Sequence, residues 1–281
     1  MGGSIFRRVA VPALAMSVIV SITGCSNLLT GNMFSNFDGP PSASDLTSRF
    51  GDDNGNVSTE DANDFVNELD DAAGSSRFFD DLSDGDRTDL ASSLESVYLN
   101  DGADGPDTET RQRAAVLAAD VTLRGADSGE TINNVANVLT SSDGPESFSD
   151  PAQLMDQIIP AGARNDSKAI QRILDDMVTA AGAYDALGAS LKDEDDDGAV
   201  DGPEGTNMAE VAQKAAVAMV VRNIVEQDSE GSKDLAERIA FGTVGDISYD
   251  DPLSSEQDKD GGAFNNILTA GGLGGFFESD A

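Results

Sequence analysis

The order of apolar and polar residues along the chain follows the period of an α-helix. In 168–191 the apolar residues recur every three or four positions and fall on one helical face. These residues are Ile170, Ile173, Leu174, Met177, Val178, Tyr184, Leu187 and Leu191. Runs of alternating β-branched residues, which would indicate strands, do not occur. The pattern therefore predicts an all-α protein.

The same spacing marks further helices on both sides of this segment. They are predicted at 59–73, 87–99, 108–123, 131–139, 151–159, 208–226 and 233–241. The connections between them are rich in Asp, Gly, Ser and Pro, which favour turns. We therefore predict a multi-helix bundle over 44–260, with a subdivision near 142–150 as an alternative. The glycine-rich segment 261–281 is predicted to be a flexible tail.

A weak internal repeat relates two of the predicted helices. The sequence Gln-Arg-Ala-Ala-Val at 112–116 parallels Gln-Lys-Ala-Ala-Val at 213–217, and each is followed by an Asp-Ser pair. Two related αα-hairpins would explain this similarity. Chance resemblance between two alanine-rich helices explains it equally well, so the sequence leaves both explanations open.

The charge balance narrows the classes of function. The chain has 52 acidic residues against 17 Lys and Arg, a formal net charge of −35. Such a surface repels nucleic acid, so no nucleic-acid partner is expected, and it favours cations or a basic protein partner. The chain has no His and one Cys, which excludes His-based nucleophilic catalysis and an intrachain disulfide. We therefore expect no enzyme, with a carboxylate- or metal-dependent hydrolase as the alternative.

The amino-terminal segment has the pattern of an export signal. Arg7 and Arg8 precede an uncharged apolar run at 9–22. The run ends in Ile22-Thr23-Gly24-Cys25, which resembles the lipobox of bacterial lipoprotein precursors. The resemblance implies a signal peptide at 1–24, acylation of Cys25, for example with palmitate, and anchoring to the bacterial cell membrane or outer membrane. Segment 25–43 is then a lipidated flexible tether. The alternatives are an ordinary signal with an incidental Cys, or an uncleaved anchor.

Between the two helices at 168–191 and 208–226 lies a strongly acidic stretch. Segment 193–204 has the form D-x-D-x-D-G-x-V-D-x-x-E and resembles the calcium loop of the EF-hand family. The calcium ligands that the resemblance implies are Asp193, Asp195, Asp197, the carbonyl of Ala199, Asp201 and Glu204. Pro203 fits the motif only in the first turn of the exiting helix. The alternative is an acidic turn exposed to solvent.

Two other segments resemble this loop less closely. In 50–61, Gly55 takes the sixth position, but Phe50 stands where the first carboxylate belongs. A turn capped by Ser58 is therefore favoured over a second metal site. Segment 256–267 begins like a third loop but has Ile267 at the twelfth position, so we predict only a turn there.

These features together predict a lipid-anchored, exported calcium-binding helical protein of the bacterial cell envelope. A cation would pin the two longest predicted helices against each other, and the expected role is structural or interactive. The alternative is an acidic ligand- or protein-binding module in which calcium is incidental.

Overall fold

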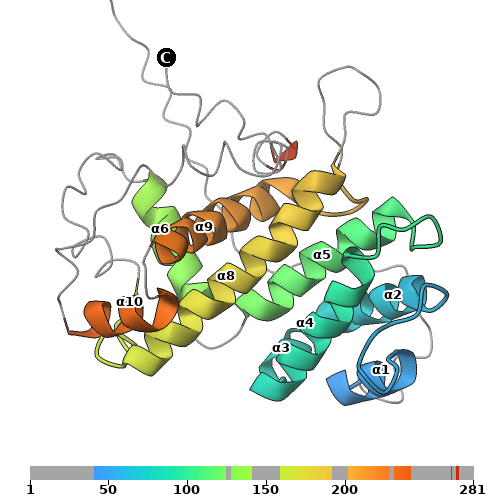
Figure 1. The fold of residues 1–281 in the computed structure, drawn as a ribbon, viewed down its shortest axis with the longest axis horizontal. Coiled ribbons are helices and arrows are strands. Elements are labelled where there is room, and N and C mark those ends of the chain that lie inside the picture. Colours follow the sequence, from blue (N-terminus) through green and yellow to red (C-terminus); the bar gives the residue numbers. More distant parts are fainter. Residues whose placement is uncertain are drawn as a thin grey trace, which may run out of the picture.

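The computed structural model describes residues 41–124, 128–140, 159–191, 202–227, 231–241 and 267, 270 and 271. The elements in these residues are helices, without a strand, which confirms the all-α prediction (Figure 1). They are α1 (Ala43–Phe50), α2 (Ala62–Ala73), α3 (Ser76–Asp80), α4 (Asp84–Tyr98), α5 (Thr108–Leu123), α6 (Ser128–Thr140), α8 (Ser167–Ser190), α9 (Met208–Gln227) and α10 (Gly231–Ala240).

The long helices lie where the periodicity predicts them. Helix α5 has the predicted bounds, α8 begins and ends one residue earlier than predicted, and α9 ends one residue later. Helix α4 begins three residues earlier than predicted, because Ser83 forms a capping box with Asp86. Of the helix predicted at 151–159, all but the last residue lies outside the described residues, as does the subdivision near 142–150.

Helix α1 moves the start of the folded domain into the predicted tether. The Ser42 side chain accepts the N–H of Asp45 at 3.2 Å, and the Asp45 carboxylate accepts the N–H of Ser42 at 3.2 Å. This capping box satisfies amides at the start of the helix. Ala43, which the sequence analysis assigned to the tether, is buried, as is Leu46. Within the described residues, the packed chain therefore begins at the cap of α1.

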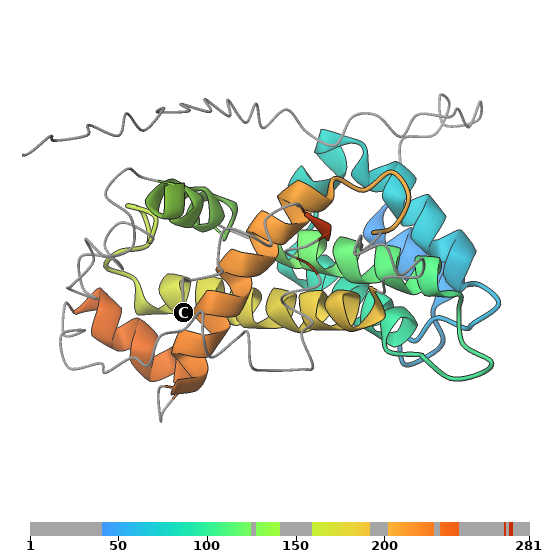
Figure 2. The ribbon, with the colours of Figure 1, turned by 90° about the horizontal axis from the view of Figure 1, so that it is seen from above.

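Helix α5 is the centre of the described bundle. It packs between α4 and α8 and also contacts α2 (Figure 1). Its buried alanines let the neighbouring helices approach closely; they are Ala114, Ala115, Ala118 and Ala119. Helix α9 crosses α8 on the side away from α4, as the view from above shows (Figure 2). Large buried side chains such as Leu90, Ile173 and Met177 each contribute roughly 1.5–3 kcal/mol of burial.

Ion pairs link the helices from equivalent positions of the weak repeat. Arg113, which follows Gln112 on α5, contacts Asp70 of α2 at 2.8 Å. Lys214, which follows Gln213 on α9, contacts Asp120 of α5 at 2.8 Å. The two helices that carry the repeated sequence, α5 and α9, thus each join a preceding helix through the same type of contact.

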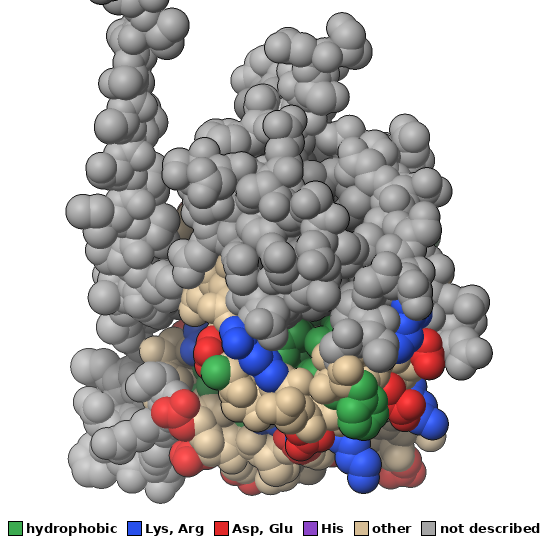
Figure 3. Space-filling model, turned by 90° about the vertical axis from the view of Figure 1, so that its left-hand side faces the viewer, with side chains coloured by type: hydrophobic (Ala, Val, Ile, Leu, Met, Phe, Trp, Pro, Cys, Tyr) green, Lys and Arg blue, Asp and Glu red, His purple; other side chains and the backbone are tan. Residues whose placement is uncertain are grey.

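On the face drawn in Figure 3, acidic and basic side chains of the described part lie next to each other.

The glycine-rich carboxyl-terminal segment is not entirely a free tail. Ile267 is in helical conformation and fully buried in the core. The α-carbon of Gly271 lies so close to Met208 and Ala212 of α9 that a Cβ would overlap them. Ile267 and Gly271 therefore differ from the predicted flexible tail, and Ile267 is a core residue rather than part of a turn. Among the described helices, none is both long and apolar enough to cross a bilayer.

Candidate cation-binding loops

Loop 50–61 joins α1 to α2 and is described in full. Phe50 is the last residue of α1 and is buried, with its ring centroid 5.8 Å from that of Phe65 on α2. The position that would supply the first carboxylate to a cation is thus part of the hydrophobic core. This loop is anchored by an aromatic contact at the point where a calcium loop has its first ligand.

The amino-terminal half of this loop is closed by its own hydrogen bonds. One carboxylate oxygen of Asp52 accepts the backbone N–H of Asn54 at 2.8 Å and that of Asn56 at 2.9 Å. These bonds, with that of Asn56 the larger contribution, lower the pKa of the Asp52 carboxyl. Gly55 has φ of 81°, a left-handed conformation that glycine adopts without strain. The carboxylate is therefore already used to fold the turn.

The second half of the loop docks on α4. The backbone N–H of Val57 donates to the Ser96 hydroxyl at 3.0 Å, and the Ser93 hydroxyl donates to the Gly55 carbonyl at 2.8 Å. Val57 also forms an isolated antiparallel bridge with Gly51. These contacts hold the loop against a helix that lies almost forty residues further along the chain.

The end of the loop has the predicted capped turn. The Ser58 hydroxyl donates to the Asp61 carboxylate at 2.7 Å and accepts the backbone N–H of Asp61 at 3.2 Å. Within the described residues, three or more acidic side chains nowhere gather in a way that suits a metal ion. The residues of 50–61 therefore fit the Ser58 turn and do not fit a calcium shell.

Most of the predicted calcium ligands in 193–204 lie outside the described residues. They are Asp193, Asp195, Asp197, Ala199 and Asp201, and the predicted lipidation site Cys25 also lies outside. Glu204 is described: it is exposed in the turn before α9, and its carboxylate has no hydrogen bond or ion pair with the described part of the chain. Its side chain is free to serve as a ligand.

The exit from this loop differs from the expected helix–loop–helix geometry. Helix α9 begins at Met208, so Pro203 lies in a separate turn, in which the Thr206 N–H donates to the Pro203 carbonyl at 3.2 Å. The condition that Pro203 should fall in the first helical turn is therefore not met. Glu204 is positioned by a turn rather than by α9, so its carboxylate is less constrained than the last ligand of an EF-hand.

The entrance to the loop is fixed by a contact that sequence reasoning missed. The Gln112 side chain on α5 donates to the backbone carbonyl of Ser190, the last residue of α8, at 3.2 Å. This bond satisfies one of the carbonyls that a helix end leaves without an intrahelical partner. The only signal for Gln112 in the sequence is its place in the weak repeat. The end of α8, just before 192–201, is therefore held against α5.

Comparisons of this chain with protein-family models, with curated proteins and with solved structures found no match.

Proposed function

We propose that this chain is a lipid-anchored, exported calcium-binding helical protein of the bacterial cell envelope, with a structural or interaction role and no catalytic activity. The observation that carries the proposal is the full match of 193–204 to the calcium-loop pattern, between α8 and α9. Of the described helices these are the longest, at 24 and 20 residues.

Electrostatic repulsion between the carboxylates of 193–204 favours the binding of a cation. Five consecutive acids, at 193–197, bring like charges together, and such repulsion favours protonation or cation binding. A calcium ion shared by Asp193 and Glu204 would relieve this repulsion and would tie the end of α8 to the turn before α9. Isolated extracellular modules of this type bind calcium with a Kd of roughly 10⁻⁴–10⁻³ M.

We propose that the ion stabilises one arrangement of α8 and α9 and does not switch the helices between two arrangements. Helix α9 crosses α8 and packs against it, and Arg222 of α9 forms an ion pair with Asp185 of α8 away from the loop. The angle between the helices is thus determined by their own packing. Calcium would add stability to this arrangement and would not open it.

A calcium titration tests the proposal directly. Calorimetry on the chain without residues 1–25 should show one calcium bound per chain, and Asp193→Ala with Glu204→Ala should remove the heat. The matched control is Asp101→Ala with Asp104→Ala, which removes two exposed acids from the loop between α4 and α5. Equal calcium binding by the two double variants would refute the assignment of the site.

Lipid anchoring is tested separately. The proposal predicts that the mature chain begins with an acylated Cys25, which mass spectrometry of the purified protein detects as added acyl mass. Cys25→Ser should move the protein from the membrane fraction to the soluble fraction. A membrane fraction unchanged by Cys25→Ser would overturn the anchor.

The net charge of −35 favours a second candidate, an acidic module that captures a basic protein. In that case binding of the partner survives chelation of calcium but is lost when salt screens the charges. Loss of capture on chelation at constant ionic strength would instead favour the calcium-dependent role.

A further inference from the structure

A groove of about 620 Å³ runs between α4 and α8, outside both candidate loops. Its floor includes small side chains from three helices, namely Ala91 of α4, Ala118 of α5 and Ala183 of α8, together with Gly182. Small residues leave room for the main chain of a ligand to approach the helices closely. The walls, in contrast, are polar and charged.

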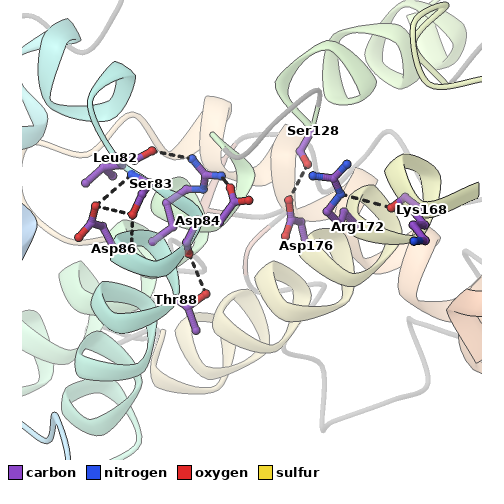
Figure 4. A network of polar contacts seen from close by, with 10 residues as sticks. Leu82, Ser83, Asp84, Asp86, Thr88, Ser128, Lys168, Arg172 and Asp176 are labelled. Carbon is purple, nitrogen blue, oxygen red and sulfur yellow. Dashed lines mark hydrogen bonds and ion pairs between the residues drawn. The ribbon is translucent and has the colours of Figure 1, made fainter. Parts of the chain in front are cut away.

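One end of the groove has two arginines. Arg87 of α4 donates to the Leu82 carbonyl at 3.1 Å and forms an ion pair with Asp84 (Figure 4). Arg172 of α8 uses its Nε to donate to the Lys168 carbonyl at 3.3 Å (Figure 4). The two terminal amino groups of Arg172 have no partner among the described residues. A planar guanidinium whose two terminal amino groups are free is suited to a carboxylate.

Asp84 and Asp176 line the same end as the two arginines, and Asp176 accepts the Ser128 hydroxyl at 3.0 Å (Figure 4). Burial raises the pKa of its carboxyl to about 6, against the opposing effects of Ser128 and Arg87. The hydrogen bond to Ser128 holds this carboxyl in place at the groove wall. Asp176 interacts electrostatically with Arg87 and lies four residues after Arg172 on α8, so its negative charge opposes that of the arginines at this end.

The other end of the groove has the opposite character. Glu95 of α4 is exposed, and its carboxylate has no hydrogen bond or ion pair within the described ranges. Burial, and secondarily the charge of Glu95, raises the pKa of the Tyr98 phenol to about 12, so the phenol stays protonated and can donate. The groove thus offers an anionic group and a hydrogen-bond donor at this end.

The two ends are separated by a distance that suits a short extended chain. Arg87 and Glu95 are eight residues apart on one helix, which corresponds to a rise of about 12 Å. An extended peptide spans about 3.3–3.6 Å per residue, so three or four residues cover this distance. A free peptide has a carboxylate at one end and an ammonium at the other at neutral pH.

We propose that the groove between α4 and α8 binds short free peptides of about three or four residues, with the carboxylate at Arg172 and Arg87 and the ammonium at Glu95. The complementary charges at the two ends fix the direction of the peptide. The floor of Ala91, Ala118 and Gly182 accommodates its main chain. This site is independent of the calcium proposal.

The test is a calorimetric titration of the full chain with trialanine, compared with trialanine amide and N-acetyl-trialanine. Wild type should bind the free peptide about tenfold more tightly than either blocked form, because each block removes one charged contact. Equal binding of free and blocked peptides, or no binding of the free peptide, would overturn the proposal. Competition by acetate at the same concentration as trialanine would reduce the site to a simple anion site and would also overturn it.

Two variants test which end of the groove binds the carboxylate and which binds the ammonium of the peptide. Arg172→Gln should remove the preference for the free carboxylate while leaving the preference for the free ammonium, and Glu95→Gln should do the reverse. Lys233→Gln, an exposed residue of α10 outside the groove, is the charge-matched control for Arg172→Gln and should keep both preferences. Because each variant is compared with itself across three peptides, a small change in stability does not affect the result. Unchanged preferences in Arg172→Gln and Glu95→Gln would contradict the proposed orientation.

A further variant uses the carboxyl beside Arg172. Asp176→Asn keeps an acceptor for Ser128 but removes a negative charge, so above pH 6 it should bind trialanine more tightly than wild type. The other groups that face Asp176 are Arg87 and Asp84 from α4, Arg172 and Asp175 from α8, and Ser128 from α6. Wild-type affinity should approach that of the variant as pH falls below 6. Weaker binding by Asp176→Asn at pH 7 would contradict the proposed place of the carboxylate.

Discussion

The loops 50–61 and 193–204 share a glycine at the sixth position and a valine at the eighth, but they differ in what closes the turn. In 50–61 the closure is internal: Phe50 is buried against Phe65, and the Asp52 carboxylate binds two backbone amides. In 193–204 five consecutive acids stand at the start, with no aromatic to anchor them. The comparison teaches that core packing can close a turn of this pattern when the first position is an aromatic residue. For 193–204, which has Asp193 at that position, we propose that a cation takes this part.

The largest expected effect comes from removing the aromatic anchor of the first loop. Phe50→Ala should lower the free energy of unfolding by about 3–5 kcal/mol, because it leaves a cavity beside Phe65. Urea denaturation measures the loss, and Phe241→Ala, at an exposed phenylalanine, is the matched control that should change little. The loss should be the same with and without calcium. Rescue of Phe50→Ala by calcium would break the contrast between the loops.

Removal of calcium should have the next largest effect, through the second loop alone. At a free calcium concentration of about 100 times Kd, the ion should add about 2.7 kcal/mol to the free energy of unfolding. Asp193→Ala with Glu204→Ala should abolish this gain, whereas the control Asp101→Ala with Asp104→Ala should keep it. Urea denaturation in calcium and in chelator measures the difference. A gain that persists in the first double variant would place the ion elsewhere.

Glycine substitutions test how much the left-handed backbone of loop 50–61 contributes to its closure. Gly55→Ala should cost about 1–2 kcal/mol, because φ of 81° is a left-handed conformation that alanine disfavours. Gly129→Ala, on helix α6 with open space around the new methyl group, should be neutral or stabilising by up to about 1 kcal/mol. Thermal unfolding of the two variants provides the measurement. An equal response would mean that the turn relaxes without cost.

The smallest expected effect is a pH dependence confined to the first loop. The folded state lowers the pKa of Asp52, so its contribution to stability is present above the unfolded pKa and is lost as pH falls through the folded pKa. Asp52→Asn should therefore reduce stability at pH 7 and flatten its loss in acid. Acid denaturation of both proteins, monitored by circular dichroism, measures this. Parallel acid profiles would show that Asp52 does not close the turn.

Periodicity was sufficient to predict the long helices but not the short ones. Helices α5, α8 and α9 have enough turns for an apolar face to be recognised, and their bounds agree with prediction to within a residue. Helices α1 and α3 have eight and five residues, too few to show a period. They form because of caps and of buried aromatics such as Phe50 and Phe78, which depend on tertiary contacts.

Some features of the candidate sites could be predicted from local sequence, and others depend on contacts between distant residues. The acidic pattern of 193–204 and the replacement of the first carboxylate by Phe50 in 50–61 are local features, so both could be recognised in the sequence. The contact from Gln112 to Ser190 joins residues 78 positions apart, and no local pattern signals it. The groove between α4 and α8 likewise depends on how α5 separates two helices that are distant in sequence.

The central position of α5 has a consequence for cooperativity. Helix α5 belongs to the hairpin with α4 and also forms the surface on which α8 packs. Neither the α4–α5 pair nor the α8–α9 pair can unfold without exposing alanines and leucines that the other pair buries. The described bundle should therefore unfold in a single transition, with coincident changes in helicity and tyrosine fluorescence. Its folding rate should be limited by the step that brings α8 onto α5, since that contact joins two helices that are distant in sequence.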